Sequence, residues 1–112
     1  MEKVLGYIGL AKRAGKLVQG TDAVLKNLRS RKTFVMVVAN DASFATQETV
    51  KKKGKFYNIP VIDKISTADL SKSLGCENIK VIGINDQGFA KAIIEGVERM
   101  TIDESQRISW NF

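Results

Sequence analysis

Residues 34–39 read Phe-Val-Met-Val-Val-Ala, and this uninterrupted apolar run constrains the fold more than any other stretch. Continuous apolar character with β-branched valines predicts a strand buried on both faces, because a half-exposed strand would alternate with polar residues. Residues 79–84, Ile-Lys-Val-Ile-Gly-Ile, predict a further, largely buried strand. We expect residues 34–39 to form the central strand of a sheet.

Helical patterns separate the predicted strands. Apolar spacing and capping residues predict helices at about residues 2–14, 22–30, 43–57, 66–74 and 86–100. Short extended segments are predicted after the first and third helices, at residues 17–18 and 59–63. Pro60 favours a strand start or a sheet edge for the second segment. This alternation predicts an α/β fold, a three-layer α/β/α sandwich with a small mixed sheet of about four strands and about five helices.

The length of 112 residues fits one domain. We expect residues 1–100 to form it and residues 101–112, which lack a clear period, to form a C-terminal tail of unknown role. The apolar runs fall short of the ~20 residues that span a bilayer, and the first residues enter an amphipathic pattern unlike a signal peptide. A soluble cytoplasmic protein is expected.

Positive charge is concentrated in the first half of the chain. Residues 1–60 carry 12 Lys and Arg against 4 Asp and Glu, whereas residues 61–112 carry 6 against 8. This asymmetry favours a basic face for a polyanion such as nucleic acid, although a solvated cationic surface that aids solubility is a competing interpretation. The four lysines within residues 51–55 are typical of a solvated face or could extend a phosphate footprint.

The absence of histidine and the single cysteine, Cys76, exclude several kinds of site. An intramolecular disulfide, a Cys-His nucleophile, a Ser-His-Asp triad and the common zinc sites all need residues that this chain lacks. Gly83 and Gly88 have the spacing of a P-loop, but Phe89 and Ala90 stand where the motif needs lysine and then a serine or threonine hydroxyl. We therefore expect neither an enzyme nor a bound cofactor or metal.

Residues 20–29, Gly-Thr-Asp-Ala-Val-Leu-Lys-Asn-Leu-Arg, predict a helix whose beginning can receive an anion. Gly20 allows a close backbone approach, Thr21 can cap the first amides, and the helix N-terminus carries partial positive charge. Asp22, Lys26 and Arg29 share the exposed stripe at 100° per residue. From these residues alone, a capped surface helix with a solvated face is the simpler alternative.

Three blocks carry a resemblance to a known family. They read Gly-Leu-Ala-Lys-Arg-Ala-Gly-Lys-Leu-Val-Gln-Gly at residues 9–20, Val-Val-Ala-Asn-Asp-Ala-Ser at 37–43 and Asn-Asp-Gln-Gly-Phe-Ala-Lys at 85–91. In this order, over about residues 2–98, they resemble the bacterial YlxQ-like branch of the kink-turn-binding ribosomal protein superfamily. The resemblance implies an α/β/α sandwich that binds structured RNA, often at a kink-turn, without catalysis or cofactor.

The helix beginning departs from the superfamily motif Gly-Ala-Asn-Glu-Val-x-Lys. The motif glycine, valine and lysine are present, whereas residues 21–23 read Thr-Asp-Ala in place of Ala-Asn-Glu. Ala23 lacks the carboxylate that would accept from a guanine edge, a contact that contributes about 1–3 kcal/mol of base discrimination. Asp22 can still accept from guanine amines.

The resulting hypothesis is a non-catalytic, monomeric protein that binds a bent or internal-loop, kink-turn-like RNA, most simply a ribosomal one. The residues assigned to the RNA, partly through the resemblance, are Lys12, Arg13, Lys16, Gly20, Thr21, Asp22, Lys26, Arg29, Ser43, Ile65, Ser66, Thr67 and Ala68. Two alternatives stay open. One is a ribosome- or transcription-associated protein–protein interaction module that has lost kink-turn recognition, and the other is a module that presents RNA to a methyltransferase.

Overall fold

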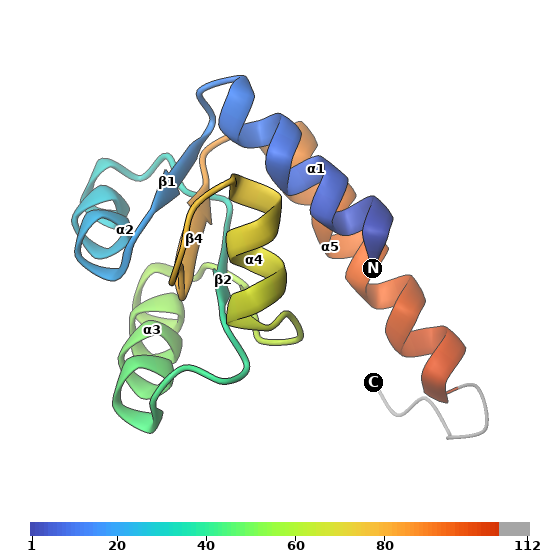
Figure 1. The fold of residues 1–112 in the computed structure, drawn as a ribbon. Coiled ribbons are helices and arrows are strands. Elements are labelled where there is room, and N and C mark those ends of the chain that lie inside the picture. The colour runs from blue at the N-terminus through green and yellow to red at the C-terminus, as the bar shows by residue number, and fades with distance from the viewer. Residues whose placement is uncertain (106–112) are drawn as a thin grey trace.

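The computed structural model describes residues 1–105, with side chains through residue 99 (Figure 1). Helices and strands alternate along the chain as predicted. In order they are α1 (Glu2–Arg13), β1 (Leu17–Gln19), α2 (Thr21–Asn27), the 3₁₀ turn η1 (Leu28–Ser30), β2 (Val35–Val38), α3 (Phe44–Tyr57), β3 (Val61–Ile62), α4 (Thr67–Leu74), β4 (Val81–Ile84) and α5 (Gln87–Ser105).

The four strands form one mixed sheet in the order β1-β4-β2-β3. β4 lies antiparallel to both β1 and β2, whereas β2 and β3 are parallel. Every residue of β2 and β4 is buried, which confirms the two apolar runs as interior strands. β3 occupies the edge position that Pro60 favoured. The predicted burial of Phe34 is wrong, because the ladder begins at Val35 and Phe34 is 41% exposed.

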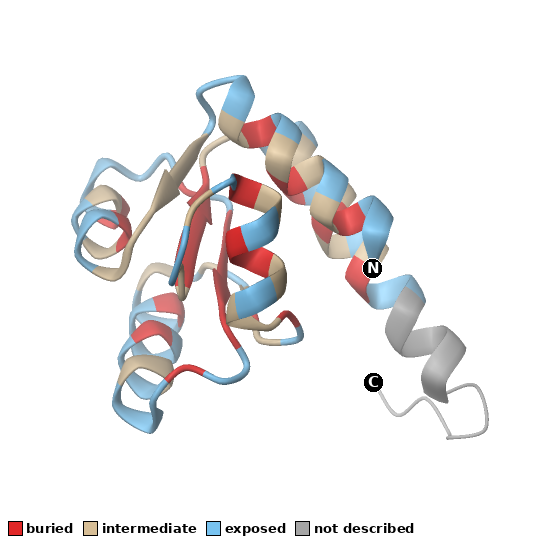
Figure 2. Cartoon of the chain, in the orientation of Figure 1, coloured by how far each residue is buried: buried red, intermediate tan, exposed pale blue. Residues whose placement is uncertain are grey.

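Helices cover both faces of this sheet. Figure 1 shows α2 and α3 on one face and α1, α4 and α5 on the other. The buried residues in Figure 2 lie along the interior strands and on the inward sides of the helices. Ile8, Leu28, Met36, Ile82 and Ile93 are among the fully buried side chains, and each contributes about 1.5–3 kcal/mol by leaving water. The predicted α/β/α sandwich is confirmed.

Capping residues stand at the beginning or the end of several helices, as the sequence predicted. Ser43 caps α3, Ser66 caps α4 and Asp86 caps α5, each by accepting a hydrogen bond from the amide three residues later. Gly75 ends α4 with a φ of 67°, and Gly15 follows α1 with a φ of 72°. Left-handed backbone of this kind is easy only for glycine.

Two helix boundaries differ from the prediction. The helix expected over residues 22–30 is an α-helix only to Asn27, after which η1 tightens the chain before Arg31 reverses it with a φ of 62°. The last helix continues to Ser105, past the end of the apolar stripe. Residues 106–112 of the predicted tail, with Trp110, lie outside the described residues.

Candidate functional site

Several elements meet at the end of the sheet where β1 and β2 finish and β4 starts. The Gly20 amide donates a 2.9 Å hydrogen bond to the carbonyl oxygen of Val81, which pairs with Val38 at the end of β2. Just beyond β2, the Asn40 amide donates to the Ile65 carbonyl oxygen at 2.9 Å. These bonds bring the start of α2 close to the loop before α4. We call this region, made of residues 19–22, 40–43, 65–68 and 80, the mouth edge.

At the mouth edge, α2 begins on a glycine with a backbone that side chains disfavour. Gly20 is the N-cap, with a φ of 98° and a ψ of 139°, and no described side chain caps the helix. The prediction that Thr21 caps α2 is wrong, because Thr21 already lies within the first turn. Asp22 and Ala23 follow and are exposed. The carboxylate of Asp22 therefore faces solvent at the start of the helix.

A series of hydrogen bonds links three segments across the mouth edge. Asp41 accepts from the Thr67 hydroxyl at 2.7 Å and from the Thr67 amide at 2.9 Å. Lys80 Nζ donates to the Thr67 hydroxyl oxygen at 3.3 Å. The hydrogen bond from the Thr67 hydroxyl, and to a smaller extent the one from its amide, holds the pKa of the Asp41 carboxyl below its ordinary value. Thr67 was assigned to the site from the sequence, whereas Asp41 and Lys80 were missed.

The remaining assigned residues of the two loops differ in what they can contact. Ser43 and Ser66 use their hydroxyl oxygens as helix caps. Ile65 is fully buried, so its side chain belongs to the core and is closed to any partner. Ala68 is exposed in the first turn of α4. Ala68 is thus the open apolar side chain of this loop.

Lys12 has a structural role at the end of α4. Its ammonium donates to the Leu74 carbonyl oxygen at 2.7 Å and to the Cys76 thiol at 3.2 Å. Gln19 donates to the same sulfur at 3.4 Å, and its Oε1 is buried with no hydrogen-bond partner in the described part of the chain. The hydrogen bond from Gln19, followed in size by the one from Lys12, lowers the pKa of the Cys76 thiol below its ordinary value. No sequence pattern predicted this cluster.

The other cations that the sequence assigned are exposed. Arg13 and Lys16 lie at the end of α1 and in the turn after it, and their side chains are open to solvent. Lys26 and Arg29 project from α2 and η1 into a groove of about 350 Å³ between α2 and α3. None of these four makes an ion pair with a described residue. They can therefore contact an anion without breaking an existing ion pair.

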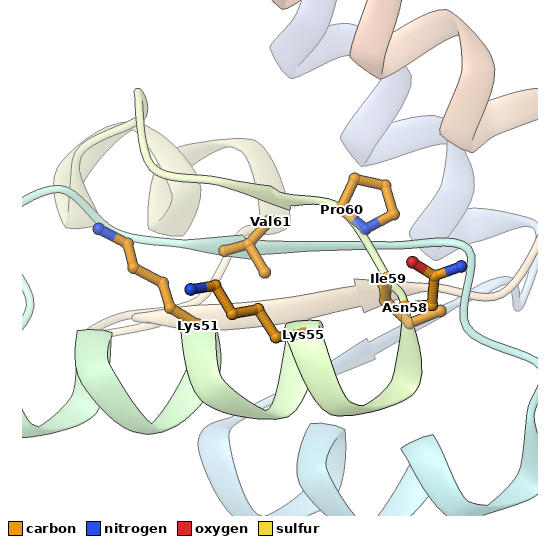
Figure 3. A pocket seen from close by; sticks show the side chains of 7 residues that line it. Lys51, Lys55, Asn58, Ile59, Pro60 and Val61 are labelled. Carbon is orange, nitrogen blue, oxygen red and sulfur yellow. The ribbon is translucent and has the colours of Figure 1, made fainter.

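A second hollow lies beside β3, at the edge of the sheet far from β1. Figure 3 shows Lys51 and Lys55 extending from α3 toward the segment that carries Pro60 and Val61, and Ile59 also lines the hollow. Its volume is about 510 Å³. Lys51 is tied to Asp63 by a 2.9 Å ion pair. None of the residues that line this hollow belongs to the mouth edge, so the two surfaces are distinct.

Two features are absent from the described residues. No group of three or more Cys, Asp or Glu side chains among them is arranged to hold a metal ion. No described helix combines the length and apolar character needed to cross a membrane.

Sequence comparisons give related proteins over most of the chain. The model of the ribosomal protein L7Ae/L30e/S12e/Gadd45 family matches residues 2–94. RNA-binding protein YlxQ of Enterococcus faecium is 40% identical over 97 residues, which cover 87% of this chain and 93% of the relative. RNA-binding protein YlxQ of Bacillus subtilis (strain 168) is 38% identical over 87 residues, covering 78% and 87%.

Solved structures share the fold. A protein of unknown function from Bacillus halodurans superposes with a TM-score of 0.84 at 28% identity, covering 88% of this chain and 99% of that one. The Giardia lamblia 15.5kD RNA binding protein gives a TM-score of 0.74 at 15% identity, covering 88% and 84%. The second likeness is one of fold alone.

Proposed function

This chain belongs to the ribosomal protein L7Ae/L30e/S12e/Gadd45 family, and from that membership we propose that it is a non-catalytic RNA-binding protein. Its proposed target is a bent or internal-loop RNA of the kink-turn type, within ribosomal RNA. The observation that carries the proposal is the meeting, at the mouth edge, of the start of α2 with the loop before α4. The two YlxQ relatives, named as RNA-binding proteins, support the same class of partner.

In this proposal the start of α2 enters the bend of the RNA. The Asp22 carboxylate accepts from a guanine amine, since a carboxylate repels phosphate and can pair only with a base edge that donates. Ala23 supplies no second acceptor, so base discrimination is weaker by about 1–3 kcal/mol than with a glutamate there. Lys26 and Arg29 neutralise phosphates beside the bend, whereas Arg13 and Lys16, at the other end of β1, contact phosphates further along the RNA.

The loop before α4 contributes a different contact. Ala68 is exposed and can pack against an unstacked base, as proteins do at RNA bulges. Asp41 and Lys80 hold Thr67, and through it the beginning of α4, in place. Lys12 takes no part in this scheme, because its ammonium already caps the end of α4. The proposed interface therefore combines base contacts from α2 with phosphate and packing contacts around it.

The test compares Lys26→Ala with Lys91→Ala, a matched exposed lysine on α5 across the sheet from α2. Affinity for a kink-turn RNA and for an unbent duplex of the same base composition is measured by fluorescence anisotropy over a range of salt. We expect the intact protein to prefer the kink-turn. Lys26→Ala should weaken binding and flatten the slope of log K against log salt by about one unit, while Lys91→Ala leaves both unchanged. Equal affinity for the two RNAs, or an unchanged slope in Lys26→Ala, overturns the assignment.

The hollow beside β3 favours a second candidate function, docking of a ribosome- or transcription-associated protein (Figure 3). Its apolar lining residues, Ile59, Pro60 and Val61, and its lysines are separate from the residues of the mouth edge. A pull-down from nuclease-treated lysate separates the two candidates. If every partner survives nuclease, and no kink-turn or ribosomal RNA fragment binds the purified protein at moderate salt, protein docking replaces RNA binding as the function.

A further inference from the structure

The groove between α2 and α3 extends the surface at the mouth edge and has the composition of a single-strand site. Its lining is Asp22, Leu25, Lys26, Arg29, Lys53 and Tyr57, around a volume of about 350 Å³. Lys53 and Tyr57 are one helical turn apart on α3, so both face α2 from the same side. Asp22 at one end of the groove is also part of the mouth edge, which makes the two surfaces continuous.

No ion pair among the described residues neutralises the positive charge of this groove. Lys26, Arg29 and Lys53 make no ion pair with any described residue, and Asp22 is the one carboxylate in the lining. Such a surface attracts a polyanion, since each neutralised phosphate releases condensed counterions.

Two aromatic rings on α3 lie beside each other, Tyr57 in the lining of the groove and Phe56 next to it, outside that lining. Phe56 is 77% exposed, and its ring meets that of Tyr57 edge to face with centroids 5.0 Å apart. The Arg31 guanidinium lies over the Tyr57 ring, 5.3 Å from its centroid. Tyr57 is the residue of this pair that lines the groove. Tyr57 is thereby held by a cation–π contact and a ring contact. The exposed Phe56 ring, packed against Tyr57 beside the groove, gives a base a face to stack on.

We propose that the α2–α3 groove binds a single-stranded RNA segment that continues from the bend, with phosphates on Lys53 and Arg29 and a base stacked on Phe56. The groove follows α2 and η1 for roughly 10 Å, which is room for about two or three stacked nucleotides. This proposal rests on the proposed function for the continuity of the RNA, but its contacts through Lys53 and Phe56 come from α3, which that function does not use. A single strand fits better than a duplex because a base within a duplex has no free face.

The experiment uses three probes: a blunt kink-turn RNA, the same RNA with a six-uridine extension on either strand, and free dodecauridine. We expect an extension on one strand to tighten binding fivefold or more over the blunt RNA. Phe56→Ala should remove most of this gain and leave the blunt RNA unchanged. Lys53→Ala should flatten the salt slope for the extended RNA by about 0.7, the value for one single-strand phosphate, and leave the blunt RNA's slope unchanged.

Phe44→Ala is the matched control, because Phe44 is 78% exposed at the other end of α3. It should change the blunt and extended probes equally. If neither extension adds affinity, or if Phe56→Ala and Phe44→Ala behave alike, the groove is not a single-strand site, although the proposed function stands while the blunt RNA binds. If only dodecauridine binds, and Phe56→Ala weakens it, the groove stands and kink-turn recognition fails. Binding of none of the probes overturns both.

Discussion

Lys12 Nζ lies 2.7 Å from the carbonyl oxygen of Leu74, the last residue of α4. This bond joins α1 to the end of a helix that is 62 residues away in the sequence. The last carbonyls of a helix have no intrahelical donor and carry partial negative charge, so an ammonium there both satisfies and stabilises them. Lys12 is thus part of the framework, although the sequence groups it with its exposed neighbours.

Replacing Lys12 should therefore cost stability. We expect Lys12→Ala to lower the free energy of unfolding by about 1–2 kcal/mol, since it removes a charge-assisted hydrogen bond and leaves the Leu74 carbonyl oxygen with the weak Cys76 thiol donor at 3.6 Å. Lys16→Ala, an exposed neighbour on the same basic stretch, should stay within about 0.5 kcal/mol of the parent. Urea unfolding followed by circular dichroism measures both. Equal stability of the two variants would show that the Lys12 bond contributes nothing to folding.

Cys76 should react faster with iodoacetamide near neutral pH than an ordinary exposed cysteine. Gln19 and Lys12 donate to its sulfur and lower the pKa of the thiol, and the thiolate is the nucleophile. Lys12→Met should raise that pKa and slow alkylation severalfold at pH 7. Lys72→Met, an exposed lysine on α4, is the control and should leave the pH profile in place. Identical profiles for both variants would remove Lys12 as a cause.

The fold was predictable because its strongest signals are local. The apolar runs of β2 and β4, and the caps Ser43 and Ser66, depend on residues that are near one another in the sequence. Phe34 was misjudged because the end of a strand is fixed by its ladder partners, which are distant in sequence. The break after Asn27 was missed because nothing in the apolar spacing separates an α-turn from a 3₁₀ turn.

The candidate site was predictable only in part. The exposure of Asp22, Lys26 and Arg29 follows from helical periodicity, so the sequence located them correctly on one face. The partners Asp41 and Lys80 could not be found in this way. They meet Thr67 because β2 pairs with β3 in parallel and with β4 in antiparallel, which brings the segments after β2 and β3 and before β4 to one end of the sheet. No local pattern encodes those pairings.

Asp41 should titrate at a lower pH than an ordinary aspartate, because the Thr67 hydroxyl and amide donate to its charged form. A carboxyl with a lowered folded-state pKa adds stability above its unfolded pKa of about 3.9, and this stability is lost as pH falls through the folded-state pKa. Thr67→Val removes the hydroxyl donor, so the pKa of Asp41 should rise toward its ordinary value. NMR titration of the Asp41 carboxyl measures this directly. Thr49→Val, at an exposed position on α3, is the control. An equal shift of the Asp41 pKa in both variants would contradict the contact between Thr67 and Asp41.

Gly20 should be costly to replace even though it has room for a side chain. A Cβ at Gly20 would meet no atom within 4 Å, so any loss of stability must come from its φ of 98°. Backbone of this kind costs other residues about 1–3 kcal/mol, and Gly20→Ala should lower the free energy of unfolding by that amount. Gly6→Ala provides the contrast, because Gly6 also has open space but lies inside α1, where alanine should add about 0.5–1 kcal/mol. If both variants change stability in the same direction in urea unfolding, the start of α2 does not depend on the conformational freedom of glycine. If Gly20→Ala is destabilised as expected, its RNA affinity should fall as well, because the position of Asp22 depends on this backbone.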